Sequence, residues 1–295
     1  MKSDFERSEE PNKLSKKNQL IPRTHPLARL AQELIIRGFS RRTIKAYLSH
    51  NQKFLDFIKK SAREINNQDI KDYLLSLKIK GYTNTSLNNV ISALKFYYQQ
   101  VLKRRLFFII VRPKREKHLP QILSKQKIKS IITAAANLKH QCILSLLYGS
   151  GLRVSEVVTL KIAEIDLDEK SVFIHKAKGN KDRYTLLSKF SLDLIKKYLI
   201  DLPEEQKYLF AGAKDKTHLH QRSVQKIFEH ACQKTGVKIN VSCHSLRHSF
   251  ATHLLENGVS IRYIQKLLGH QSIKTTEIYL KVARDFWQDL ESPLD

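Results

Sequence analysis

Apolar residues recur every three or four positions from Pro26 to about Arg105, and this spacing restricts the fold more than any other feature of the sequence. The period places apolar side chains on one face of an α-helix. Gly38 is a stop signal, Ser40 after it is a good N-cap, and Gly81 ends a further helix. The pattern predicts four amphipathic helices that form a compact bundle. Their apolar positions are Leu27, Leu30, Ala31, Leu34, Ile35, Ile44, Tyr47, Phe54, Phe57, Ile70, Tyr73, Leu74, Leu77, Leu87, Val90, Ile91, Leu94, Tyr97 and Tyr98.

The charge balance indicates what the chain binds. It carries 53 Lys and Arg against 28 Asp and Glu, a formal net charge of +25. This excess is far beyond what solubility requires and implies a polyanionic partner. Nucleic acid is the first candidate, and an anionic membrane surface or a solvated lysine face is the alternative. Residues 1–120 hold 26 basic and 10 acidic side chains, a net of +16, and residues 121–295 hold 27 and 18, a net of +9.

Other features of the sequence indicate where in the cell the protein is located. The three cysteines are odd in number and form no CxxC pair, which argues against a disulfide framework or a cysteine zinc site. The segment Met1–Lys17 is polar and resembles no secretory signal. The longest apolar run, Leu106–Val111, is too short to span a bilayer. We therefore expect a cytoplasmic protein without a membrane partner.

The chain divides into four parts. Residues 1–24 are polar and lack periodicity, so we expect a flexible tail before a helical domain at 25–106. Residues 107–121 form a basic linker with two prolines. Two interpretations of the linker stay open: a strap along DNA phosphates, or a solvated connector whose Phe107–Val111 tucks against a domain surface. A second domain occupies 122–295.

The second domain mixes helices with strands. Ile128–Ala135 and Gln141–Leu147 have helical spacing, whereas apolar residues at Val172–Ile174 and Tyr184–Leu187 flank Lys178-Gly-Asn. A Gly-Asn pair between two such runs predicts a β-hairpin. The fold class is therefore mainly α, with a small β-sheet in the second domain.

The densest chemical signal lies near the C-terminus. His244 and Arg247 are three residues apart and share one helix face. His244 and His248 have the spacing of a zinc helix, but Ser245 stands where a metalloprotease has glutamate. Gly149-Ser-Gly151 matches a dinucleotide loop only weakly because the last glycine is missing. The sequence shows no tight cluster of carboxylates to hold two metal ions, so it does not support a two-metal nuclease.

Four separated motifs carry a family resemblance. Leu147-Tyr-Gly-Ser-Gly-Leu-Arg-Val-Ser-Glu156 resembles the first-arginine motif of tyrosine recombinases, and Lys178-Gly-Asn-Lys-Asp-Arg183 resembles their β-hairpin lysine motif. His244-Ser-Leu-Arg-His-Ser-Phe-Ala-Thr-His253 is similar to their His-x-x-Arg box, and Leu268-Gly-His270 with Tyr279 to their last histidine and nucleophile. The match covers about residues 26–285 and is nearest to the Xer-type and integron-type integrase branch.

The resemblance implies a fold and a reaction. The fold is an N-terminal four-helix SAM-like DNA-binding bundle followed by an α+β catalytic domain. The reaction cleaves and rejoins DNA through a 3′-phosphotyrosine, with no metal, ATP or other cofactor. The implied catalytic set is Arg153, Lys178, His244, Arg247, His270 and Tyr279.

Each residue type suits its implied role. Arg153 and Arg247 would clamp the phosphate, since a guanidinium presents a planar, charged fork. Tyr279 would attack, and nearby arginines favour its phenolate. By resemblance, Lys178 is the general acid for the leaving oxygen, His244 acts as acid or base, and His270 hydrogen-bonds the phosphate.

Neighbouring residues receive lesser roles. We expect Glu156 to orient Arg153, and His248 and His253 to be structural. Lys181 and Arg183 are expected to contact the DNA backbone or solvent rather than to react. The apolar residues of the C-terminal tail suit packing on a neighbouring protomer or on the same domain; they are Val282, Phe286, Trp287 and Leu290.

The implied partner is a double-stranded DNA recombination site bound by a homotetramer or heterotetramer. Chromosome dimer resolution, phage-like integration and integron-type cassette capture all remain open, as does the need for a second recombinase. A non-enzymatic DNA-binding protein with this fold, or a relaxing enzyme related to type IB topoisomerases, are the competing functions.

Overall fold

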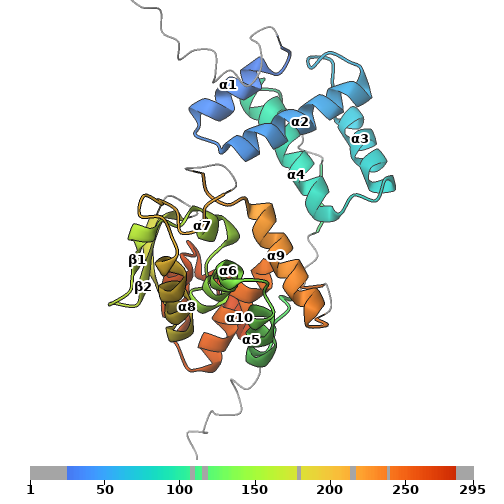
Figure 1. Ribbon diagram of the computed structural model, residues 1–295. Helices are drawn as coiled ribbons and strands as arrows, with labels where there is room; N and C mark the ends of the chain where they lie inside the picture. Colours follow the sequence, from blue (N-terminus) through green and yellow to red (C-terminus); the bar gives the residue numbers. More distant parts are fainter. Residues whose placement is uncertain are drawn as a thin grey trace, which may run out of the picture. The chain divides into compact units, whose positions relative to one another are not determined.

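The computed structural model describes residues 25–106, 110–114, 119–177, 181–212, 217–237 and 240–283. The chain separates into two compact units, Met1–Lys117 and His118–Asp295. Figure 1 shows the first as a cluster of helices in blue and cyan, and the second as helices beside a small sheet. No helix in the described part of the chain is both long and apolar enough to cross a bilayer.

The first unit is the helical bundle that the apolar spacing predicts. Its elements are α1 (Ala28–Ile36), α2 (Arg41–Ile58), α3 (Asn67–Ile79), α4 (Asn84–Lys95) and a π-helical turn (Phe96–Val101) that continues α4. Ser40 caps α2 by accepting from the Thr43 amide at 3.2 Å. Two of the predicted apolar positions are exposed, Ile35 at 48% and Phe57 at 43%. Both lie at the edge of an apolar face whose inward positions are taken by Leu34 and Phe54.

Part of the expected linker lies on the bundle. Asn84 Nδ2 donates to the carbonyl oxygen of Lys114 at 3.0 Å, and Asn88 Nδ2 donates to that of Pro113 at 2.9 Å. The two asparagines are one turn apart on α4, so Pro113 and Lys114 lie beside this helix. Residues 107–109 and 115–118 lie outside the described ranges.

The second unit contains helices and a three-stranded antiparallel sheet with the order β1-β2-β3. The hairpin of β2 and β3 confirms the sequence prediction, with Val172 opposite Thr185. Its elements are α5 (Lys125–Thr133), α6 (Leu138–Gly149), α7 (Val154–Thr159), a 3-10 turn (Ile162–Glu164), β1 (Ile165–Asp166), β2 (Ser171–Ala177), β3 (Lys181–Leu186), α8 (Lys189–Ile200), α9 (Gln221–Lys234), α10 (Cys243–Glu256), α11 (Ile261–Leu268) and the 3-10 turns Ile273–Thr275 and Glu277–Lys281.

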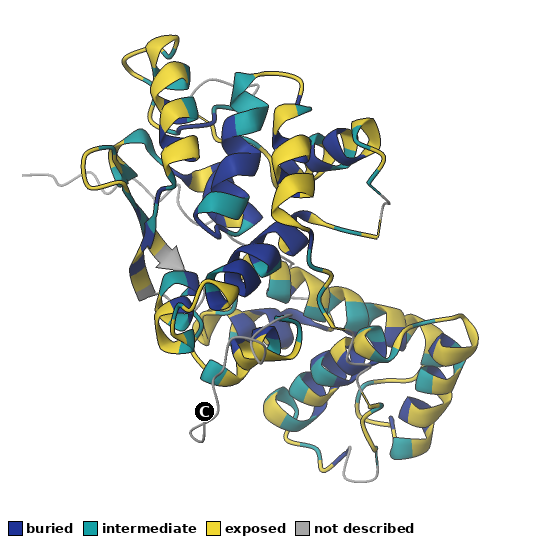
Figure 2. Cartoon of the chain, turned by 90° about the horizontal axis from the view of Figure 1, so that it is seen from below, coloured by how far each residue is buried: buried dark blue, intermediate teal, exposed yellow. Residues whose placement is uncertain are grey.

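Helix α10 lies inside this unit and carries the predicted His-x-x-Arg box. It packs against α6, α11 and the 3-10 turn Glu277–Lys281. Figure 2 shows the buried residues, in dark blue, gathered on the inward faces of the helices. Leu246, Phe250 and Leu255 of α10 are buried. Because α10 has buried residues on nearly all sides, its polar side chains must find partners within the protein.

Gly151 shows how tightly this region is packed. Its φ is +61°, and a Cβ at this position would lie 2.4 Å from Phe250 Cδ1. Gly258 also has a positive φ of +78°, but nothing lies within 4 Å of a Cβ there. The two glycines therefore differ in the space around them and share the backbone conformation.

We expect Gly151→Ala to lower the free energy of unfolding by about 3 kcal/mol, because the left-handed conformation costs roughly 1–2 kcal/mol and overpacking adds roughly 1–3 kcal/mol. Gly258→Ala should show the conformational part alone. Urea unfolding followed by circular dichroism measures both. Equal losses in the two variants would contradict the packing described for Gly151.

Candidate active site

One buried carboxylate binds guanidinium groups from separate segments. Glu156 lies in the first turn of α7, whose N-cap is Arg153. Its carboxylate accepts from the Arg153 amide at 2.8 Å and from Arg153 Nη1 at 2.7 Å. Arg183 of β3 donates to both oxygens, at 2.9 and 2.8 Å. Arg247 of α10 lies further off, with Nη1 3.8 Å from Glu156 Oε2.

This arrangement keeps Glu156 ionised. Burial by itself raises the pKa of Glu156, but the hydrogen bonds and charge of Arg183, the Arg153 amide and the charge of Arg247 outweigh burial and lower that pKa to about 2. One negative charge thus faces three positive ones. The excess positive charge makes the cluster a site for an anion with several oxygen atoms.

Arg247 is held by backbone carbonyl groups. Its Nη1 donates to the Gly151 oxygen and its Nη2 to the Leu268 oxygen, both at 2.5 Å. Burial and the nearby Arg153 lower the pKa of Arg247 to about 9, so it stays charged at neutral pH. Arg153 is the more accessible of the two, with its side chain 18% exposed against 5% for Arg247.

Tyr279 lies beside this cluster in the 3-10 turn Glu277–Lys281 and is only 2% exposed. Its phenol oxygen is 3.2 Å from Nδ1 of His248. Burial raises the pKa of Tyr279, and Arg247 and Arg153 only partly oppose this. The arginines therefore favour the phenolate as expected, but in the free protein burial has the larger effect and keeps the phenol protonated.

Two further histidines complete the group. The ring of His244 lies one turn before that of His248 on α10, with centroids 5.9 Å apart. His270 follows α11, with Nδ1 2.9 Å from Thr276 Oγ1 and Nε2 3.4 Å from Arg247 Nη2. Burial, then the charge of Arg247, lowers the pKa of His270 to about 4, so it is neutral at pH 7. The same pKa applies to His248, through burial and then the charge of His244.

The structure brings together five of the six residues in the implied catalytic set, while Lys178 lies outside the described residues. His248, for which we expected a structural role, contacts the Tyr279 phenol through its ring. His253 contacts the Tyr148 hydroxyl at 2.9 Å.

Arg183 departs from the expectation of contact with the DNA backbone or solvent, because its side chain is buried. The residue is 9% exposed, and its guanidinium donates to both oxygens of Glu156 and to the carbonyl oxygen of Leu267. Strand alternation is the signal that identifies its direction: Tyr184 is 66% exposed, whereas Thr185 on the opposite face is buried at 2%. Positions 183 and 185 share a face of β3, so Arg183 points inward.

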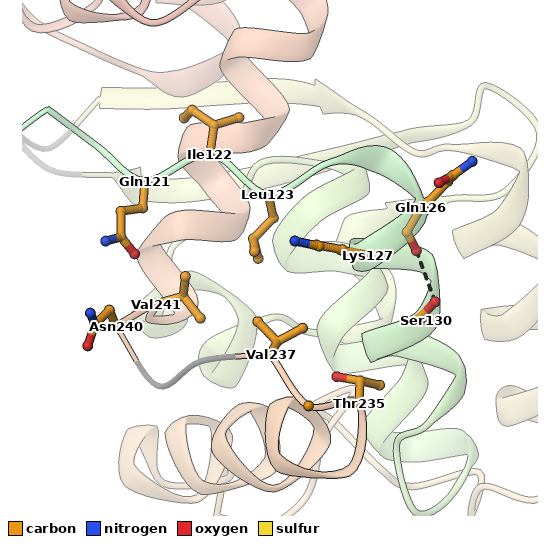
Figure 3. Close-up of a pocket in the computed structure, with 11 residues that line it drawn as sticks. Gln121, Ile122, Leu123, Gln126, Lys127, Ser130, Thr235, Val237, Asn240 and Val241 are labelled. Carbon is orange, nitrogen blue, oxygen red and sulfur yellow. Dashed lines mark hydrogen bonds between the residues drawn. The ribbon is translucent and has the colours of Figure 1, made fainter.

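A separate hollow of about 740 Å³ lies between α5 and the segment that follows α9. Figure 3 shows Lys127 and Ser130 of α5 on one side, with Val237 and Val241 on the other. No residue of the arginine cluster lines it. Within the described ranges, no three or more His, Cys, Asp or Glu side chains are grouped to hold a metal ion.

Comparison with known proteins gives consistent matches. The profile of the Phage integrase family matches residues 121–285, and that of the phage integrase N-terminal SAM-like domain matches residues 27–107. Tyrosine recombinase XerA of Pyrococcus horikoshii is 38% identical over 272 residues, covering 91% of this chain and 93% of that protein. Tyrosine recombinase XerC of Lacticaseibacillus casei is 31% identical over 282 residues, covering 88% and 94%.

Solved structures agree. A crystal structure of XerA recombinase shares 34% identity and a TM-score of 0.51, and covers 86% of this chain and 92% of that one. XerH site-specific recombinase, bound to its difH substrate in a pre-cleavage complex, has 22% identity and a TM-score of 0.67, covering 87% and 84%. This second likeness is one of fold.

The pKa of Glu156 sets a pH dependence of stability. Because folding lowers that pKa from 4.5 to about 2, its stabilisation is complete above pH 4.5 and disappears as pH falls toward 2. We expect Glu156→Gln to cost roughly 3–5 kcal/mol of unfolding free energy at pH 7, the usual cost of breaking a buried ion pair. The difference from the unmodified protein should shrink between pH 5 and pH 2.

Urea unfolding at several pH values measures this difference. Glu229→Gln is the matched control, since Glu229 pairs with Arg222 on the surface and such pairs contribute little. A cost for Glu156→Gln that does not vary with pH would contradict the ion pairing described here.

Proposed function

The chain belongs to the phage integrase family of tyrosine recombinases, enzymes that cleave and rejoin DNA strands by site-specific recombination, and from this premise we propose that Tyr279 is its nucleophile. The observation that carries the proposal is the position of the buried Tyr279 phenol beside a cluster with an excess of positive charge. We assign the catalytic roles to Arg153, Lys178, His244, Arg247, His270 and Tyr279.

The proposed reaction is a phosphoryl transfer in which one ester bond forms as another breaks. The Tyr279 oxygen forms a bond to the scissile phosphorus while the bond to the 5′-oxygen breaks. The product is a 3′-phosphotyrosine and a free 5′-hydroxyl, and the reverse attack by a 5′-hydroxyl rejoins the strand. Because the phosphodiester is exchanged rather than hydrolysed, no ATP is needed.

Charge stabilisation is the proposed task of the arginines. Arg153 and Arg247 bind the non-bridging oxygens of the phosphate, where negative charge accumulates in the transition state. His270 adds a hydrogen bond. Lys178 gives its proton to the leaving 5′-oxygen, and His244 takes the proton that the phenol releases. His248 contacts the phenol and positions its oxygen in the free protein.

The substrate also prepares the site. A phosphate beside the histidines favours their protonated forms and so raises their pKa values. Histidines with pKa values near 4 are weak bases in the free protein. DNA binding therefore makes these histidines stronger bases than they are in the free protein.

Double-stranded DNA is the proposed partner of both halves of the chain, since residues 1–120 and 121–295 carry net charges of +16 and +9. Affinity should fall steeply with salt as phosphate contacts release counterions. We place the protein in the cytoplasm and propose that it acts as a tetramer on two DNA sites. Its task is Xer-like chromosome dimer resolution or integration of a mobile element.

The nucleophile is tested by covalent capture. The protein is incubated in EDTA with DNA of its host that has been nicked at random, then denatured, and the DNA bound covalently to protein is isolated and sequenced. We expect adducts with the unmodified protein and with Tyr263→Phe, an exposed control tyrosine, and none with Tyr279→Phe. Adducts that persist in Tyr279→Phe would overturn the assignment.

The captured sequence also distinguishes the biological tasks. A single chromosomal site supports dimer resolution, whereas sites at the ends of a mobile element support integration.

The effect of DNA on the histidines is measured by NMR titration of their ring nitrogens. In the free protein we expect His248 and His270 to stay neutral as pH falls from 7 and to titrate near pH 4. Binding of the captured duplex to Tyr279→Phe should raise both values by about one unit or more, the usual effect of a close opposite charge. Unchanged values would show that the phosphate binds elsewhere.

A further inference from the structure

We propose that Arg183 is a positioning residue of the DNA-cleaving site, which occupies Glu156 and so leaves Arg153 and Arg247 free to bind the phosphate, without touching the phosphate itself. The inference rests on the proposed function of the cluster. Its basis is the set of contacts that Arg183 makes with segments far apart in the sequence.

A single side chain joins the hairpin to two other parts of the site. Arg183 starts on β3, and its Nη1 and Nη2 donate to Glu156 on α7 at 2.9 and 2.8 Å. Its Nε donates to the carbonyl oxygen of Leu267, near the end of α11, at 2.8 Å. With its side chain only 7% exposed, Arg183 directs its donors to protein atoms.

These contacts also fix the backbone that leads to His270. Arg183 and Arg247 donate to consecutive carbonyl groups, those of Leu267 and Leu268. Such carbonyl groups at a helix end lack partners within the helix, and positive charge there is favourable. The stem of Arg183 lies so near Gly269 that a Cβ at that position would be 2.9 Å from Arg183 Cδ. Arg183 therefore shapes the turn directly before His270.

The charges give Arg183 its second effect. Arg183 occupies both oxygens of Glu156, while Arg247 stays 3.8 Å from the same carboxylate. Without Arg183, Arg247 and Arg153 alone would compensate the negative charge of the buried Glu156 carboxylate. Their positive charge would then be neutralised within the protein and withdrawn from the phosphate. Arg183 thus competes for Glu156 and leaves the other two arginines available.

The test compares two scissile groups in the DNA captured by covalent adduct formation. One duplex carries the ordinary phosphodiester, and the other a methylphosphonate, in which a neutral methyl group replaces a charged non-bridging oxygen. The variants are Arg183→Gln and Arg183→Lys. Lys161→Gln is the control, because Lys161 forms an ion pair with Glu164 in the same unit outside the cluster. Single-turnover cleavage is measured with protein in excess.

We expect Arg183→Gln to cleave the phosphodiester on the order of 10–100-fold more slowly, the loss typical when a supporting partner of a reactive group is removed. On the methylphosphonate its deficit should shrink toward that of Lys161→Gln, since less negative charge needs stabilisation. Arg183→Lys should recover only part of the rate, because a lysine keeps the charge but cannot form the fork. If Arg183→Gln fails to fold, the lysine variant carries the same comparison.

Equal slowing on both duplexes would indicate a purely structural role and would overturn the proposal, as would an unchanged rate on the phosphodiester. Failure of the proposed function gives a different result, because the unmodified protein itself then forms no adduct at Tyr279. That result would contradict both proposals.

Discussion

Three arginines share one buried carboxylate, so the site has an excess of positive charge. The rest of the second unit is arranged around this excess. Glu156 is fully engaged by Arg153 and Arg183 and lies within 3.8 Å of Arg247. Uncompensated buried charge is costly, so the guanidinium groups need fixed partners, which the carbonyl groups of Gly151, Leu267 and Leu268 provide. The tight turn at Gly151 and the end of α11 serve this purpose. The arginines keep an excess of positive charge, which a bound phosphate would neutralise.

The same excess of positive charge acts on the protonation of Tyr279, the proposed nucleophile. Burial holds its phenol in the protonated form against the pull of Arg153 and Arg247, and a neutral His248 accepts from it or donates to it at 3.2 Å. Until a phosphate enters, the site has little tendency to ionise the tyrosine. In the proposed reaction, the negative charge of DNA shifts the histidines toward protonation and so couples reactivity to the presence of substrate.

Much of this was predictable, and the failures have physical causes. Apolar periodicity predicts four helices in the first unit, because burial of one face stabilises each of them; it fails at Ile35 and Phe57, which lie at the edge of that face. The motif residues come together as expected, apart from Lys178, which lies outside the described ranges. Arg183 was missed because charge suggests a surface position until a buried partner is known, although the alternation of β3 points it inward. His248 and the high pKa of Tyr279 depend on contacts between α10 and the turn Glu277–Lys281, which no spacing along the chain reveals.

Peptide mapping of the DNA adduct tests the central claim most directly. The covalent complex formed by the unmodified protein is digested with nuclease and protease, and the residue that carries the remaining nucleotide is located by mass spectrometry. We predict one modified site, Tyr279, linked to a 3′-phosphate. A nucleotide on any other residue, or a link through a 5′-phosphate, would contradict it.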